Sequence, residues 1–201
     1  MRQEQGFGKP TTVAKLRMVG ADHAVLREKD DFYPTPPDMT HALLAVEQFC
    51  GRIWEPACGD GAISEILRLA GHDVVSSDLV DRGYGIARRD FLMEQMPPHA
   101  VHIITNPPFK LGEKFWRHAH TIAPGKVAFV ARLTWLEGME RATMFRQFPL
   151  SRVWVAPWRP KFQRGRQATD KDASGMLPHA WYVHDPEHKG PPVLGWLTRP
   201  S

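Results

Sequence analysis

The sequence predicts an α/β fold with a single open, mostly parallel β-sheet flanked by helices. Short apolar runs typical of buried strands alternate with segments in which apolar residues recur at helical spacing. Polar or glycine-containing motifs at residues 55–62, 78 and 106–109 each follow a predicted strand. Ligands of open α/β sheets bind beyond the carboxyl ends of the strands. The same pattern therefore predicts both the fold and the edge of the sheet that carries the site.

The elements are expected in the following order. A proline-stiffened extended segment covers residues 31–37, and Asp38 is placed to cap the helix that follows it. Ile53 begins the first strand, and the helix after the glycine loop ends at Gly71. The other strands are expected at about 74–78, 101–105, 126–133, 153–155, 181–183 and 194–197, and the other helices at about 113–122 and 136–148.

Length and composition place these elements in one domain. The chain has 201 residues, enough to bury a core without disulfides. We divide it into an N-terminal arm, residues 1–30, and a domain, residues 31–201. Its two cysteines are too few for a disulfide framework and indicate a cytoplasmic protein. No apolar run approaches the ~20 residues that span a bilayer, and the polar N-terminal residues are not typical of a secretory signal, so we expect no membrane partner.

Positive charge is concentrated in one segment. The chain has a net charge of +4, and residues 158–171 hold five basic residues against one Asp, which equals that whole excess. We expect a basic loop at about residues 158–178 to bind nucleic acid, because cations contact phosphates and aromatic rings stack on bases. The alternative is a solvated basic loop after a strand. The candidate contact residues are Arg159, Lys161, Phe162, Arg164 and Arg166.

The glycine loop at residues 55–62 indicates a cationic ligand. Gly59 and Gly61 allow a tight turn and a close approach of the backbone to a ligand. Ser64 stands where a dinucleotide-binding fingerprint has its third glycine. Glu55 and Asp60 would repel a pyrophosphate and would attract an ammonium or a sulfonium group.

Two acidic residues further along the chain complete the predicted ligand site. Asp78 lies nineteen residues after Gly59, the spacing at which an acid binds ribose hydroxyls in nucleotide-binding α/β units. Asp90 follows twelve residues later and can accept a hydrogen bond from an adenine amino group. The implied ligand is an adenosine that carries a cationic amino acid, which is S-adenosylmethionine. The alternative is that both acids cap helices or are solvated loop residues.

Asn106, Pro107, Pro108 and Phe109 form the candidate catalytic motif. An exocyclic amine on a purine is a weak nucleophile, because its lone pair is delocalised into the ring. The Asn106 side-chain oxygen and the Pro107 carbonyl can accept its two N–H bonds and localise that lone pair, and the prolines hold the loop in place. Phe109 offers a ring on which a flipped base can stack. The alternative is a proline turn with Phe109 in the core.

The sequence indicates neither covalent nor metal-dependent chemistry. Cys58 lies inside the glycine loop, where a small buried side chain is the expected role. The histidines do not share a helical face at ligand spacing, so no metal site is expected.

These motifs resemble the class I S-adenosylmethionine-dependent methyltransferases, and more narrowly the adenine-N6 DNA methyltransferases of bacteria and phages. The resemblance implies a Rossmann-like fold and direct in-line methyl transfer from S-adenosylmethionine to adenine N6 in DNA. It also assigns Asn106–Phe109 as the catalytic tetrapeptide and places Tyr33 and Thr35 over the methionine end of the donor. The donor-binding residues that follow are Tyr33, Thr35, Glu55, Ala57, Gly59, Gly61, Asp78, Asp90, Phe91 and Asn106.

The chain departs from the resemblance in having little sequence beyond the sheet for a target-recognition region. Recognition would then come from short elements or from an accessory protein. An RNA adenine or a protein glutamine stays open as the acceptor, because an amide or aryl NH₂ poses the same geometric problem. A non-catalytic nucleic-acid-binding module with a methyltransferase fold is the third reading.

Overall fold

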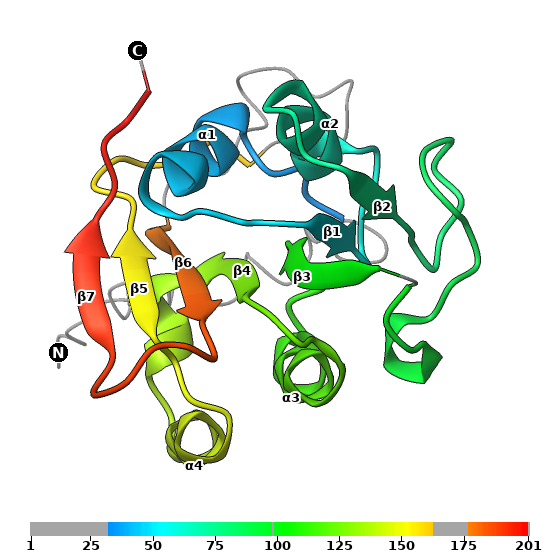
Figure 1. Ribbon diagram of the computed structural model, residues 1–201. Helices are drawn as coiled ribbons and strands as arrows, with labels where there is room; N and C mark the ends of the chain where they lie inside the picture. Colours follow the sequence, from blue (N-terminus) through cyan, green and yellow to red (C-terminus); the bar gives the residue numbers. More distant parts are fainter. Residues whose placement is uncertain (1–31, 98, 163–176, 201) are drawn as a thin grey trace, which may run out of the picture.

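The computed structural model describes residues 32–97, 99–162 and 177–200, so the predicted N-terminal arm and most of the predicted basic loop lie outside the described residues. Within these residues, seven strands form one sheet in the order β2-β1-β3-β4-β6-β5-β7. Neighbouring strands run parallel except at β6, which is antiparallel to β4 and β5 (Figure 1). The predicted open, mostly parallel sheet is confirmed. The strands are β1 Arg52–Glu55, β2 Val74–Ser76, β3 Ala100–Thr105, β4 Val127–Arg132, β5 Arg152–Val155, β6 His179–His184 and β7 Val193–Trp196.

Helices cover both faces of the sheet. In Figure 1, α1 (Pro37–Val46) and α2 (Ala62–Leu69) lie on one side of it, and α3 (Gly112–Ile122) and α4 (Met139–Gln147) lie on the other. The helix predicted over residues 136–148 begins later, as α4, and is preceded by a short 3-10 helix, η3 (Leu133–Leu136). Gly138 separates them with a φ of 103°, a conformation that favours glycine.

The start of α1 differs from the prediction that Asp38 caps it. Pro36 occupies the N-cap position and Pro37 begins the helix, while Asp38 lies in the first turn. Proline suits this place because its missing N–H would have no partner within the helix. The Asp38 carboxylate still favours the helix, since it lies near the positive end of the helix dipole.

The core lies in two layers, one on each face of the sheet. Ala128 and Val130 of β4 face the layer under α1 and α2, which includes Leu43 and Leu67. The alternating residues of β4, such as Phe129, face the layer that packs against α3 and α4. This alternation follows from the two-residue period of a strand and fixes the register of β4 in the middle of the sheet.

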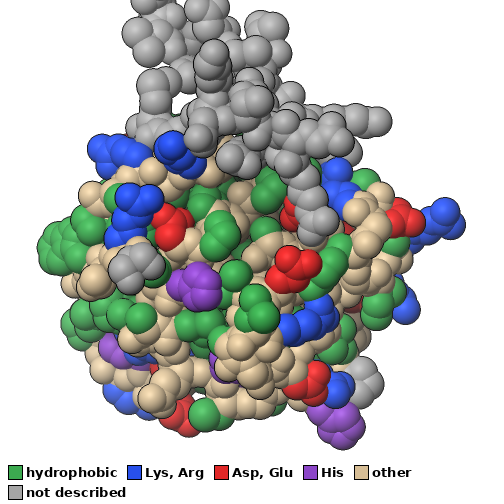
Figure 2. All heavy atoms as spheres, turned by 90° about the horizontal axis from the view of Figure 1, so that it is seen from above, with side chains coloured by type: hydrophobic (Ala, Val, Ile, Leu, Met, Phe, Trp, Pro, Cys, Tyr) green, Lys and Arg blue, Asp and Glu red, His purple; other side chains and the backbone are tan. Residues whose placement is uncertain are grey.

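The face that carries α1 and α2 has mixed charge. In Figure 2, basic and acidic side chains are scattered there among apolar and neutral ones, and neither sign dominates the part of the face that is described. In the described ranges, no helix has both the length and the apolar character needed to cross a membrane.

Candidate functional site

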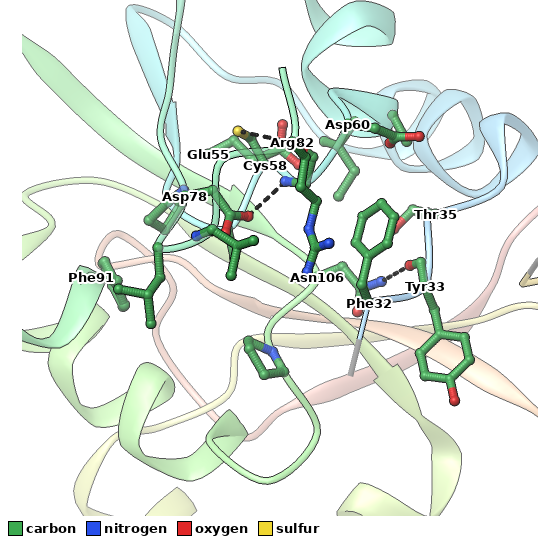
Figure 3. A pocket seen from close by; sticks show the side chains of 18 of the residues that line it. Phe32, Tyr33, Thr35, Glu55, Cys58, Asp60, Asp78, Arg82, Phe91 and Asn106 are labelled. Atoms are coloured by element: carbon green, nitrogen blue, oxygen red, sulfur yellow. Dashed lines mark hydrogen bonds between the residues drawn. The ribbon is translucent and has the colours of Figure 1, made fainter. Parts of the chain in front are cut away.

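A cavity of about 510 Å³ opens beside the carboxyl ends of β1, β2 and β3. The sequence placed its motifs at this edge, and the fold brings them together around one space (Figure 3). The size is within the range of sites that hold cofactors. Of the predicted donor-binding residues, those that line it are Tyr33, Thr35, Glu55, Ala57, Gly59, Asp78, Asp90, Phe91 and Asn106.

The glycine loop supports the cavity through two residues with positive φ. Gly59 has a φ of 56° and Gly61 a φ of 92°. A Cβ at Gly59 would come within 2.3 Å of the Phe32 ring, and one at Gly61 within 2.4 Å of the Tyr84 ring. Both rings therefore lie close to bare backbone. Gly61 precedes α2 as its N-cap and is not part of the cavity wall itself, so its role is to shape the loop.

Asp78 connects the end of β2 to the glycine loop. Its Oδ2 accepts a hydrogen bond from the Gly59 N–H at 2.8 Å, and its Oδ1 accepts one from the Val80 N–H at 2.8 Å. These two bonds fix the carboxylate at the cavity wall. Each oxygen keeps a further lone pair, which is what a ribose hydroxyl would need.

Asp90 and Phe91 begin the short 3-10 helix η2 (Phe91–Met93) on the far side of the cavity. The Asp90 side chain accepts from the Leu92 N–H at 3.1 Å, so the predicted alternative, a helix cap, is present while the residue also lines the cavity. The Phe91 ring is buried, and its centre lies 5.2 Å from the ring centre of Trp54 and 4.7 Å from that of Phe115. The hydrophobic core thus holds this wall of the cavity in place.

Glu55 ends β1 and is almost fully buried. The Ser64 hydroxyl donates a hydrogen bond to the Glu55 carboxyl, and a second hydrogen bond joins the hydroxyls of Ser64 and Ser76. Burial raises the pKa of Glu55 well above its usual range, even though the Ser64 hydrogen bonds act to lower it. The carboxyl is therefore poised to become charged when a cation lies beside it, because a nearby positive charge lowers a carboxyl pKa.

Asn106 is oriented by the segment that precedes α1. Its Nδ2 donates a hydrogen bond of 2.9 Å to the Tyr33 carbonyl, shown dashed in Figure 3. An amide that donates in one direction presents its oxygen in the other, so Oδ1 points away from Tyr33 as an acceptor. Thr35, from the same segment, is 3% exposed, and its hydroxyl has no hydrogen-bond partner among the described residues. A buried hydroxyl without a partner beside a cavity indicates a site for a polar ligand.

The tetrapeptide forms a wall between two cavities. Asn106 and Pro108 line the large cavity, whereas Pro107 and Phe109 line a second cavity of about 220 Å³. This second cavity also contains Trp135 and is bounded by residues at the carboxyl end of β4. Adjacent residues of the motif thus border both spaces, so groups bound in the two spaces would meet at the tetrapeptide.

Several solved structures are similar in fold to this chain, whereas sequence comparisons found no match. No protein-family model and no curated protein matches the sequence. A modification subunit assigned to a type I restriction enzyme of Vibrio vulnificus is similar, with a TM-score of 0.52 and 16% identity over 91% of this chain and 49% of its own. A protein of Pyrococcus horikoshii assigned as an RNA methyltransferase gives 0.50 and 14% over 67% of this chain and 74% of its own. The chain has a Rossmann-like methyltransferase fold.

A third structure with the methyltransferase fold is similar to the chain over most of its length. A predicted O-methyltransferase of Agrobacterium tumefaciens has a TM-score of 0.50 and 13% identity, covering 80% of this chain and 84% of its own. The three differ in the acceptors that their names give. The methyltransferase fold is therefore established, and the acceptor has to be argued from the residues of the site.

The predicted nucleic-acid residues are only partly described. Arg159 and Lys161 are exposed, as a phosphate contact requires, and Arg164 and Arg166 lie outside the described residues. Phe162 corrects the prediction: its side chain is 4% exposed and packs 4.3 Å from the ring of His179. A ring buried in the core cannot stack on a base, so Phe162 is a core residue here.

Several residues that line the two cavities were not predicted from the sequence as site residues. Phe32 and Arg82 line the large cavity, with the Arg82 guanidinium 4.1 Å from the Phe32 ring centre. The Arg132 guanidinium lies over the Phe109 ring, 4.6 Å from its centre, and Arg132 lines the second cavity together with Trp135. The position of Arg132 at the end of β4 was a usable signal, because the other motifs also follow parallel strands.

Proposed function

We propose that this chain binds S-adenosylmethionine and transfers its methyl group to the N6 amine of adenine in DNA. The observation that carries the proposal is the orientation of Asn106. Its amide nitrogen is held by the Tyr33 carbonyl, so its oxygen is left as an acceptor at the wall of the large cavity, next in the chain to Pro107, which lines the second cavity. A nucleophilic amine needs such an acceptor on one of its N–H bonds.

The large cavity fits S-adenosylmethionine in shape and in donor groups. Bare backbone at Gly59 lets the Phe32 ring pack closely against the loop at the cavity, and the Thr35 hydroxyl, which has no partner among the described residues, offers a hydrogen bond to the amino-acid end. Asp78 and Asp90 keep acceptor capacity for ribose and adenine, and Glu55 is available to a cation. When bound, S-adenosylmethionine supplies a methyl group on a positively charged sulfur.

On the acceptor side, the chain orients a planar amine and leaves its proton to solvent. We assign one N–H of that amine to the Asn106 oxygen and the other to the Pro107 carbonyl. Two acceptors in these directions draw the nitrogen towards a tetrahedral shape and localise its lone pair towards the donor cavity. The nitrogen would form its bond to the methyl carbon of the donor as the carbon–sulfur bond breaks. The sulfur would leave as the neutral thioether S-adenosylhomocysteine, and the methylated amine would then lose one proton to water. No strong base is required, because an amine that has just gained a methyl group is acidic.

A nucleic acid is the acceptor that the surroundings favour. Phe109 and Trp135 give the second cavity aromatic walls suited to a base, and Arg132 and Arg141 give it positive charge. Exposed Arg159 and Lys161 add cations after β5. The structures of similar fold include both a restriction-enzyme modification subunit and a protein assigned as an RNA methyltransferase, so the fold similarity is in keeping with a nucleic acid and does not choose between DNA and RNA. We propose DNA, with an accessory protein for recognition, on the resemblance of the tetrapeptide. We place this chemistry in the cytoplasm, in keeping with the reduced cysteines.

The test is a methyl-transfer assay with labelled S-adenosylmethionine, offering duplex DNA, single-stranded DNA, RNA and cell-extract protein in parallel. Label recovered as N6-methyladenine from DNA is the expected result. Label in RNA adenine or in protein glutamine would keep the chemistry and replace the acceptor. Donor binding without any transfer would support the non-catalytic module or a missing accessory protein, and adding candidate partner subunits separates these two.

Asn106→Ala tests the assigned role directly. We expect turnover to fall by at least ~100-fold, the effect of losing one preorganised polar group, while the affinity for donor changes little. Binding of S-adenosylhomocysteine, measured by calorimetry, gives that affinity independently of turnover. An equal loss of binding and turnover would show that Asn106 only supports the donor cavity.

A further inference from the structure

Arg82 and Phe32 form a layered stack at the donor cavity. The Phe32 ring lies against the backbone of Gly59, and the Arg82 guanidinium carbon lies 4.1 Å from the centre of the same ring. The three layers come from three separate segments: the lead-in to α1, the glycine loop and the loop after β2. In Figure 3, the Arg82 side chain reaches across the cavity towards Phe32 and Asn106. When a guanidinium stacks on an aromatic ring, its flat face contacts the ring, and its N–H groups point outward in the plane of the guanidinium, where they can bind a ligand.

The charges around the cavity leave one group of the donor without an obvious partner. Four acidic residues line the cavity and suit the ammonium, the sulfonium and the hydroxyls of S-adenosylmethionine. The same acids repel its carboxylate, which therefore requires a cation. The lining acids are Glu55, Asp60, Asp78 and Asp90.

Three cationic residues line the described part of the cavity, and they differ in how they are held. Arg89 and Lys110 are both exposed to solvent. Arg82 is half-buried and positioned by the Phe32 ring. A planar guanidinium fixed in this way can bind a carboxylate through two parallel hydrogen bonds.

We propose that Arg82 binds the carboxylate of the amino-acid part of the donor. This inference rests on the proposed function, because it takes S-adenosylmethionine as the ligand. Arg82 thereby selects the complete amino-acid donor over adenosyl compounds that lack the carboxylate. Because Arg82 also stacks on Phe32, donor binding is coupled to the position of the segment that holds Asn106 through Tyr33.

The experiment compares two ligands by calorimetry on the full chain. S-adenosylmethionine carries the carboxylate, and decarboxylated S-adenosylmethionine keeps the ammonium and the sulfonium but lacks it. We expect Arg82→Gln to weaken binding of S-adenosylmethionine by about 10- to 100-fold, the range for a hydrogen bond to a charged group, and to change binding of the decarboxylated compound by less than about 3-fold. Arg89→Gln, from the same cavity wall, is the matched control and should leave the ratio of the two affinities unchanged.

Other outcomes separate the two proposals. If Arg82→Gln weakens both ligands equally, Arg82 only supports Phe32, and the carboxylate role is wrong while the donor assignment stands. If the unaltered protein binds neither ligand, the proposed donor itself is wrong. Thermal unfolding of each variant without ligand shows whether a lost affinity reflects lost folding, and Arg82→Lys, which keeps the charge but not the fork, should recover part of the preference.

Discussion

Replacing Gly59 by alanine tests whether the glycine loop and the Phe32 ring form one wall of the donor site. Two costs can be separated from the structure. The first is backbone strain, because Gly59 has a φ of 56°, where an L-residue costs about 1–2 kcal/mol. The second is contact, because the new Cβ would lie 2.3 Å from Cε2 of Phe32. Carbon atoms pack at about 3.5 Å or more, so the ring must move by at least ~1.2 Å.

Gly71 supplies a matched control for the strain. It also has a positive φ, 90°, and a Cβ there would meet nothing within 4 Å. The strain should therefore cost each variant about 1–2 kcal/mol of unfolding free energy, which lowers the melting temperature by about 2–8 °C in a chain of this size, and the contact with Phe32 adds to this loss in Gly59→Ala alone. Thermal unfolding followed by circular dichroism measures this shared cost.

Only Gly59→Ala should also lose donor affinity. A displacement of about 1 Å moves Phe32 off its place and disturbs Arg82, and misplacements of this size can cost about 10- to 100-fold. Calorimetry with S-adenosylhomocysteine gives the affinity of both variants. If Gly59→Ala binds as tightly as Gly71→Ala, the ring is not part of the donor wall, and the reasoning from the Gly59–Phe32 contact is refuted.

Two further substitutions address the cavity and the stability of the fold. Thr35→Val removes a buried hydroxyl that has no partner among the described residues; we expect donor affinity to fall by about 10-fold with unfolding free energy unchanged, and a loss of stability instead would mark a structural role. Glu47→Gln removes the charge of a buried carboxylate that accepts hydrogen bonds from Lys126, Arg152 and Trp154. The free energy of unfolding, measured in urea at pH 7, should fall by about 3 kcal/mol. Burial alone would raise the pKa of Glu47, but these hydrogen bonds hold it below the usual 4.5. The stability that the charged carboxylate contributes is therefore fully present above pH 4.5 and is lost as the pH falls through the lowered pKa. The gap between the two proteins should therefore narrow in acid, and a gap that is constant with pH would contradict the ionic account.

The sequence predicted many of the residues that line the large cavity because that cavity is built from local motifs. Gly59, Asp78 and Asn106 each follow a strand directly, and parallel strands bring their carboxyl ends together whatever the details of the packing. The alternation of strands and helices predicted the sheet for the same reason. Antiparallel β6, inserted between β4 and β5, could not be predicted in this way, because strand order depends on packing between distant segments.

Errors in the sequence analysis arose where side-chain direction depends on tertiary packing. Phe162 alternates with basic residues and was assigned to nucleic acid, yet its ring is buried against His179. Trp135 packs against the core at Trp116 and also lines the second cavity, so one ring has both settings. An aromatic residue has the same signature in both settings, so composition alone cannot separate a core ring from a binding ring.

The second cavity also bears on the acceptor. Two guanidinium groups, those of Arg132 and Arg141, line this cavity. The side-chain amide of a protein glutamine is small and neutral, so it brings no negative charge to pair with them. Arg141 is partly neutralised by Glu113 at 3.4 Å, whereas Arg132 lies over Phe109, the ring proposed to stack on the base. A nucleotide satisfies both features at once, since its base stacks on aromatic rings and its phosphates attract the arginines. Charge and aromatic surface together therefore favour a nucleic acid over a protein amide, and they do so at residues independent of the basic segment after β5.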